Sequence, residues 1–118
     1  MMDSEQVTIE QTVIEYLDGV MTVDVHAEKP DGLPGKFILV ERLRGSYSDK
    51  INTVAIAVQS YADSLLDAAE IDAAVFEAMK SIVMLDRVGG CRLENRYNFT
   101  DISEKKYRYQ SVYEIRYF

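Results

Sequence analysis

The chain contains few of the residues on which covalent cross-linking and catalysis depend. Its 118 residues include one cysteine, Cys91, and one histidine, His26. A single cysteine excludes an intrachain disulfide, and the strand-like pattern around Cys91 favours a buried structural thiol over a nucleophile or metal ligand. His26 lies in a short alternating segment, where a solvent-exposed strand residue is favoured over a catalytic base. We therefore expect no enzymatic activity, no cofactor and no metal ion.

Long apolar runs and glycine-rich ligand loops are also missing. No stretch approaches the roughly 20 apolar residues that a membrane-spanning helix needs. The start MMDSEQ is acidic, whereas a secretory signal starts with basic residues. No GxGxxG or Walker-type motif is present. The length and the 47% apolar content predict one globular domain over residues 1–118, located in the cytoplasm and with no membrane partner.

Positive charge is scarce and unevenly distributed. The net charge of −7 argues against binding to duplex nucleic acid, which needs clustered Lys and Arg. Residues 1–86 carry 6 basic and 16 acidic side chains, whereas residues 87–118 carry 7 basic and 4 acidic ones. Such asymmetry arises either from an incidental surface or from a subunit whose opposite ends meet complementary neighbours.

Two segments have helical periodicity. In the first, Thr8 is the expected N-cap, with Asp3 or Ser4 as alternatives, and Gly19 the expected end. Its apolar stripe is Ile9, Val13, Leu17 and Val20. The second runs from about residue 63 to residue 85, and its predicted core stripe is Leu65, Leu66, Ala69, Ala73, Phe76, Met79 and Val83.

The remaining segments alternate with the period of a β-strand. They are VDVHAE, KFILVERLR, KINTVAIAVQSY, CRLENRYNF and the closing YRYQSVYEIRYF. The short connection GSYSD between the second and third predicts a hairpin. In the third, one face is flat and small and consists of Thr53, Ala55, Ala57 and Gln59. Such a face permits close approach by another layer or subunit, but it is also found in ordinary solvated strands, which is the interpretation adopted here.

The segment order predicts an α+β domain with the order α-β-β-β-α-β-β. We expect an antiparallel sheet with two α-helices packed on one face. In the closing strand the tyrosines alternate with polar residues, so they are predicted to contribute mainly to the core between sheet and helices. By the same alternation, Cys91, Leu93, Tyr97 and Phe99 are expected on the core side of the preceding strand, and Arg92, Glu94, Arg96 and Asn98 on the polar side.

Tyrosines and arginines interleave on these last two strands, which is typical of platforms that bind single-stranded RNA. In the last strand, however, the two residue types point to opposite faces, whereas stacking and phosphate contacts need a shared surface. We expect no specific nucleic-acid partner. A small single-stranded RNA-binding or ligand-binding domain remains the alternative.

The order of several segments resembles the tail terminator, or tail completion, proteins of long-tailed bacteriophages and prophages. The resemblance covers roughly residues 8–118 and rests on TVIEYLDG, VDVHAEKP, LPGKFILVERLRGSYSD, VAIAVQSYADSLLDAA and the tyrosine-rich closing strand. It implies a ring, usually hexameric, that caps the tail tube, stops its polymerisation and presents a surface to the head connector. It implies no cofactor or turnover, and places the protein in the virion tail after assembly in the bacterial cytoplasm.

The expected partners are therefore further copies of the chain, the major tail tube protein and the head-tail connector protein. Another neck or connector component is the alternative within the same setting. Strand parity and charge, rather than a family motif, suggest the contact residues. They are Arg42, Arg44, Tyr47 and Lys50 around the hairpin and Arg92, Arg96, Arg108 and Arg116 on the polar sheet face.

Overall fold

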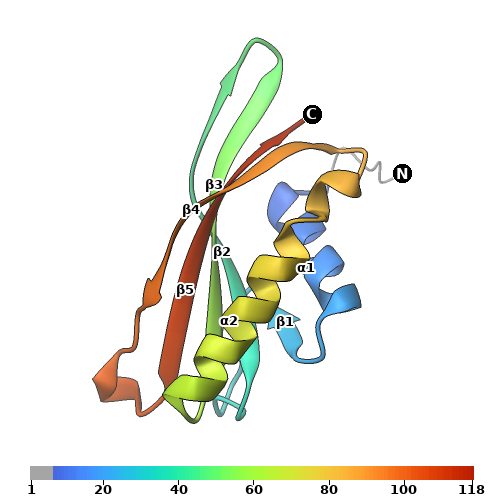
Figure 1. Ribbon diagram of the computed structural model, residues 1–118. Helices are drawn as coiled ribbons and strands as arrows, with labels where there is room; N and C mark the ends of the chain where they lie inside the picture. The colour runs from blue at the N-terminus through green and yellow to red at the C-terminus, as the bar shows by residue number, and fades with distance from the viewer. Residues whose placement is uncertain (1–6) are drawn as a thin grey trace.

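A computed structural model describes residues 7–118 as a sheet of five strands with two α-helices packed on the same side (Figure 1). The elements are α1 (Ile9–Val20), β1 (Asp24–His26), β2 (Phe37–Ser48), β3 (Ile51–Ala62), α2 (Leu65–Met79), β4 (Val88–Asn98) and β5 (Tyr107–Tyr117). Two short 3-10 helices, η2 (Ile82–Met84) and η3 (Ile102–Glu104), precede β4 and β5. The predicted α+β class and element order are confirmed.

The sheet is mixed, with the strand order β1-β2-β3-β5-β4. The pairs β2/β3, β3/β5 and β5/β4 are antiparallel, as expected, but β1 pairs parallel to β2. An entirely antiparallel sheet was therefore the wrong expectation at its first strand. The connection over residues 27–36 returns the chain to the end at which β1 began, and a parallel pair requires such a return.

Helix α1 follows its sequence signals closely. The Thr8 hydroxyl accepts a hydrogen bond from the backbone amide of Gln11 at 3.1 Å, as an N-cap does. Ile9, Val13 and Leu17 are buried against the sheet, whereas Val20 is 54% exposed. The alternative starts at Asp3 and Ser4 lie outside the described residues.

Helix α2 is rotated relative to its predicted orientation. Ser64 caps it through a hydrogen bond from the Asp67 amide. The buried stripe is Ala68, Ile71, Asp72, Val75 and Met79. This stripe differs from the predicted one by about one residue, or about 100° around the axis, and leaves Leu66 68% exposed. Because apolar residues occur on several sides of α2, periodicity alone selected the wrong side. Neither helix is both long and apolar enough to cross a membrane, within the described residues.

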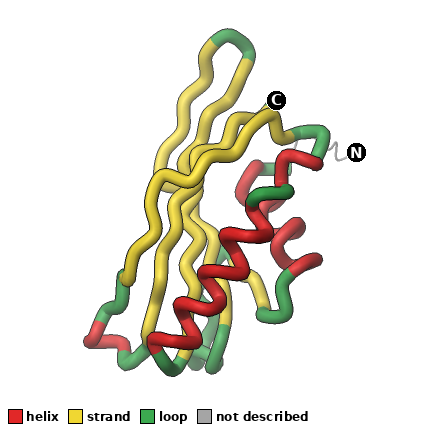
Figure 2. Tube along the Cα trace, viewed as in Figure 1, coloured by secondary structure: helices red, strands yellow, loops and turns green. Residues whose placement is uncertain are grey.

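The core lies between the two helices and one face of the sheet, the layers drawn in red and yellow in Figure 2. Alternate strand residues supply the sheet side, including Ile38, Val54, Ile56, Val58, Tyr113 and Ile115, all of them buried. Tyr113 and Tyr117 are buried there and Tyr109 packs against the cluster, which confirms the expected role of these tyrosines. Tyr107, near the start of β5, remains 41% exposed.

The hairpin formed by β2 and β3 projects past the helices, and its tip stands clear of them in Figure 1. Strand β2 is longer than predicted and β3 is shifted by one residue, because the turn is the pair Asp49–Lys50 rather than residues 45–49. These two residues have φ values of 52° and 67°, the left-handed region that a tight two-residue hairpin turn requires. All residues from Glu41 to Lys50 are exposed.

Candidate interaction surfaces

The face of the sheet opposite the helices, here called the open face, has a small buried layer of its own. Ala55, Ala57 and Val112 form a cluster in which Ala57 is 0% exposed. An ordinary solvated strand was therefore the wrong interpretation of this flat face. The long polar side chains of neighbouring strands cover the small residues.

A continuous chain of hydrogen bonds crosses the open face. The Tyr61 hydroxyl donates to the Gln59 side-chain oxygen at 3.2 Å, and the Gln59 amide donates to Gln110 at 2.7 Å. The Gln110 amide in turn donates to the Tyr97 hydroxyl at 2.6 Å. These contacts join β3, β5 and β4 by side chains in addition to the backbone ladder, so they fix the polar groups that this face presents.

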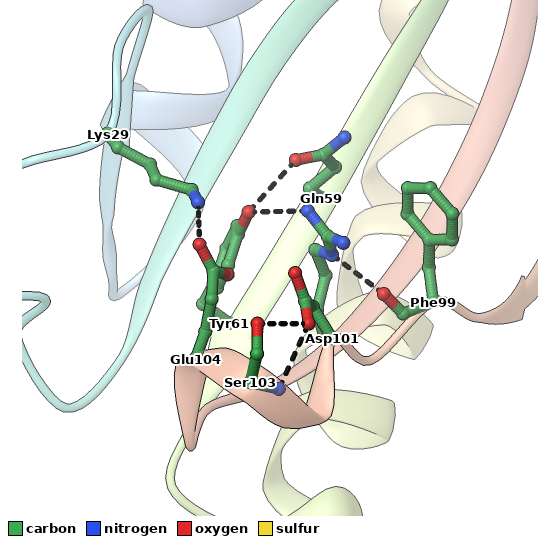
Figure 3. A network of polar contacts seen from close by, with 8 residues as sticks. Lys29, Gln59, Tyr61, Phe99, Asp101, Ser103 and Glu104 are labelled. Atoms are coloured by element: carbon green, nitrogen blue, oxygen red, sulfur yellow. Dashed lines mark hydrogen bonds and ion pairs between the residues drawn. The ribbon is translucent and has the colours of Figure 1, made fainter.

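Arg108 starts this chain and is held on several sides; Figure 3 labels its partners Tyr61 and Phe99. Its guanidinium donates to the Tyr61 hydroxyl at 2.9 Å and to the backbone oxygen of Phe99 at 2.8 Å. It also lies over the Phe99 ring, 4.3 Å from the centroid. The ring of Tyr61 in turn stacks on the ring of Phe37, with a centroid distance of 4.4 Å. Arg108 therefore lies on the open face as predicted, in a fixed orientation.

The loop around η3 extends this network at the end of the open face (Figure 3). Lys29, from the connection before β2, forms an ion pair with Glu104, and the hydrogen bond from Lys29 to Glu104 raises the pKa of the Lys29 amine. The Ser103 hydroxyl and backbone amide both donate to Asp101, and these bonds lower the pKa of Asp101. This contact joins two segments that are distant in the sequence, since Lys29 and Glu104 are 75 residues apart.

Two ion pairs cross the other half of the open face. Arg44 on β2 contacts both carboxylate oxygens of Glu94 on β4, at 2.8 and 3.0 Å, above the two strands between them. Arg92 contacts Glu114 at 3.1 Å. A shallow groove of about 190 Å³ lies between Arg44, Glu94 and Glu114. Arg92 is therefore on the open face as predicted, and Arg44, which was predicted only as a hairpin residue, lies there too; each has an acidic partner.

Arg116 is also on the open face, opposite Gly90 in the β4–β5 register. A Cβ atom at position 90 would lie 2.8 Å from the Arg116 guanidinium nitrogen. The glycine therefore provides the space in which this guanidinium lies. Arg116 itself is exposed.

Arg96 is not on the open face, and its predicted position is corrected here. The β4–β5 register shifts between Leu93 and Asn95, so Glu94 is an extra residue and the alternation reverses after it. Arg96 consequently faces α2 and binds the fully buried carboxylate of Asp72 at 2.8 Å, with its guanidinium over the Phe76 ring.

The same bulge moves the aromatic residues that follow it. Tyr97 and Phe99 were expected on the core side, but Tyr97 bonds to Gln110 on the open face and the two rings pack edge to face at 5.4 Å. Both are partly exposed, at 38% and 40%. Tyr97 of β4, Phe99 just after this strand and Arg108 of β5 therefore share one surface, although the tyrosines and arginines of β5 itself point to opposite faces.

The four hairpin residues are divided by a second bulge, between Arg42 and Arg44. Arg42 lies on the helix side, where it donates to the Tyr117 hydroxyl at 3.2 Å and approaches Glu10 of α1 at 3.9 Å. Arg44 lies on the open face. Tyr47 is 66% exposed near the tip, and Lys50 is an exposed turn residue. The hairpin thus presents Tyr47 and Lys50 near its tip, whereas Arg44 is held against the sheet by Glu94.

Two titratable groups lie on the helix-covered side, whereas His26 lies on the open side of β1 next to Phe37. Burial raises the pKa of the Cys91 thiol to about 11 and that of the Tyr113 hydroxyl to about 12. Cys91 is a free, partly buried thiol that packs against the core, in line with its predicted structural role. His26 is less solvated than expected, because its ring packs edge-on against Phe37 and its Nε2 atom is buried.

Sequence comparisons found no protein family and no curated protein that matches this chain.

Several residues of these surfaces were not identified from the sequence. Gln59 and Gln110 stand opposite each other in the β3–β5 register, so a polar pair within two apolar strands was a usable signal. Asp72 was a weaker signal, since an acidic residue in a helix is usually exposed. The bulges that redirect Arg96 and Tyr97 leave no pattern in the sequence, because alternation simply resumes after the extra residue.

Proposed function

We propose that this protein is a structural subunit of a bacteriophage tail that forms a ring, with six copies expected, on the end of the tail tube. The ring stops tube polymerisation and offers a surface to the head-tail connector protein. The observation that carries the proposal is the projecting β2–β3 hairpin, whose tip stands clear of the helices in Figure 1 and contains the exposed residues Tyr47 and Lys50. A projecting arm with an exposed aromatic residue suits contact with a neighbouring subunit or with the tube.

The distribution of charge supports a subunit that meets unlike surfaces. Helix α1 contains Glu10, Glu15 and Asp18 and no Lys or Arg, and α2 contains four acidic residues and no basic one. Residues 87–118, by contrast, carry 7 basic and 4 acidic side chains. Subunits of a closed ring join through two different patches, and patches of opposite charge favour that arrangement over a two-fold dimer.

The function requires binding only, so neither turnover nor a cofactor belongs to the proposal. The partners are further copies of the chain, the major tail tube protein and the connector protein. The site of action is the end of the virion tail, and assembly takes place in the bacterial cytoplasm.

The test is the distribution of tail lengths, measured by electron microscopy in phage lysates with and without the gene. Loss of the terminator should give overlong tails without heads, and a plasmid copy of the wild-type gene should restore normal length. Complementation with Tyr47→Ala combined with Lys50→Glu tests the hairpin, and Glu77→Gln on the outer side of α2 is the control. Normal tails joined to heads in the deletion would exclude the function, whereas normal-length tails without heads would indicate another neck component.

One observation favours a second candidate, a domain that binds single-stranded RNA. The β4 bulge brings Tyr97 and Phe99 onto the same face as Arg108, so rings and a guanidinium share a surface. Binding of a random RNA oligomer that weakens as salt rises, and that is reduced in Phe99→Ala, would support this candidate. No binding at low salt would remove it.

A further inference from the structure

The sheet has a free strand edge beside helix α1. Strand β1 covers β2 only over Phe37–Leu39, and the outer edge of β2 from Val40 to Ser48 pairs with no other strand among residues 7–118. The backbone amides and carbonyls on such an edge are available to an added strand. An exposed strand edge is therefore the first element of a docking site.

A groove lies along the start of this edge. It has a volume of about 530 Å³ and is lined by Glu10 and Ile14 of α1, by Ala27 just after β1, and by Val40, Glu41 and Arg42 of β2. Because Ala27 follows the last residue of β1, the groove continues the path of β1 alongside β2. An extended segment in this groove would bond to the β2 backbone and contact Ile14 and Val40 with its side chains.

The same sheet has a second free edge on its opposite side. Strand β4 pairs only with β5, so its outer edge is unpaired over Val88–Asn98 within the described residues. The two edges also differ in charge. Residues 9–28, which surround the groove, contain five acidic residues and no Lys or Arg, whereas residues 87–118 are net basic. Strand β4 itself contains two arginines, Arg92 and Arg96, and one acidic residue, Glu94, so this edge of one copy is weakly basic and complements the acidic residues beside the groove of another.

From these observations we infer that copies of this chain associate head to tail by pairing the β4 edge of one copy with the β2 edge of the next, in the groove beside α1. Because the contact joins two different surfaces, a row of subunits has one unpaired strand edge at each end until the row closes into a ring. This inference rests on the proposed ring and names its interface.

Cysteine cross-linking tests the pairing directly. In a Cys91→Ser background, Glu41→Cys on the β2 edge is combined in turn with Arg92→Cys, Asn95→Cys or Tyr97→Cys on the β4 edge. All four positions lie on the open face, and the β4 positions sample different registers. Under mild oxidation at least one combination should give a ladder of covalent oligomers. Glu41→Cys combined with Glu77→Cys on α2 is the matched control and should remain uncross-linked.

Single-cysteine proteins then identify the symmetry. A mixture of the Glu41→Cys protein with the matching β4 variant should give cross-linked dimers of the two proteins, and neither protein should form covalent dimers alone. Dimers of Glu41→Cys alone would show two-fold β2–β2 pairing and overturn the inference. A protein that is monomeric by native mass spectrometry, or an oligomer that none of the combinations cross-links, would also overturn it.

These outcomes are distinguishable from failure of the proposed function. Cross-linked ladders together with normal tails in the gene deletion would leave the edge pairing standing and remove the tail role. Overlong tails in the deletion, without cross-linking in any combination, would support the tail role and place the ring interface elsewhere.

Discussion

On the helix-covered face of the sheet, large apolar side chains pack against α1 and α2, and Tyr113, Ile56 and Ile115 are almost completely buried. On the open face, the buried apolar side chains are fewer: the small cluster of Ala55, Ala57 and Val112, and the stacked rings of Phe37 and Tyr61 at one end. Ion pairs and side-chain hydrogen bonds occupy the rest of this face. Burial of one large apolar side chain contributes about 1.5–3 kcal/mol, whereas an exposed ion pair contributes about 0–1 kcal/mol. The comparison shows that the helix-covered face supplies most of the apolar burial, with Phe37 and Tyr61 adding to it on the open face, whereas the exposed ion pairs of the open face contribute little to stability.

Asp72 is the exception that sharpens this comparison, because it is a charged residue on the apolar face. Its carboxylate is 0% exposed and its ion-pair partner is Arg96. We expect Arg96→Ala to have the largest effect, a loss of about 3 kcal/mol in the free energy of unfolding, because it leaves a buried charge without a partner. Urea unfolding measures the change.

The control for this prediction replaces both members of the pair. Asp72→Leu combined with Arg96→Met removes the charges together and should recover most of the lost stability. A single Arg96→Ala variant as stable as the wild type would contradict the structural role of the pair.

The second-largest effect is expected at alkaline pH, where two groups on the helix-covered face should lower the free energy of unfolding. Burial raises the pKa of Cys91 from 9.0 to about 11 and that of Tyr113 from 10.0 to about 12. At a pH between the ordinary pKa and the raised pKa of each group, the unfolded chain has released a proton that the folded protein retains. The free energy of unfolding should therefore fall as pH rises above about 9, by up to about 1.4 kcal/mol per pH unit for each group, and be independent of both groups below that.

Urea midpoints measured from about pH 8 to about pH 11 would test this sign. Cys91→Ser should remove the part of the slope that begins near pH 9, whereas the part that begins near pH 10 should remain. A stability that rises over this range would contradict the stated burial of these groups.

The smallest effect is expected on the open face. Arg92 and Glu114 form an ion pair in which the Arg92 side chain is 70% exposed. Arg92→Ala should lower the free energy of unfolding by less than about 1 kcal/mol, since water and salt screen the pair. A loss as large as that of Arg96→Ala, measured in the same urea experiment, would mean that the two faces do not differ as described.

The positions of some open-face residues were predictable from the sequence. Alternation in the last strand placed Arg108 and Arg116 on the open face, and no bulge interrupts β5 against β3. Alternation failed at Arg96 because Glu94 is an extra residue in β4, and it failed to separate Arg42 from Arg44 because Leu43 is an extra residue in β2. A single inserted residue reverses every side chain after it, and the local sequence does not record its position.

The sequence by itself determined the elements of this protein, because periods of 2 and 3.6, the caps Thr8 and Ser64 and the turn residues act over short distances. Only the tertiary structure decided how the elements face one another. The parallel pairing of β1, the rotation of α2 that buries Asp72 and the bulges in β2 and β4 depend on partners distant in the chain. The physical reason is packing. Apolar side chains must be buried and buried polar groups must find partners across the whole domain. This requirement decides between local arrangements whose free energies are nearly equal.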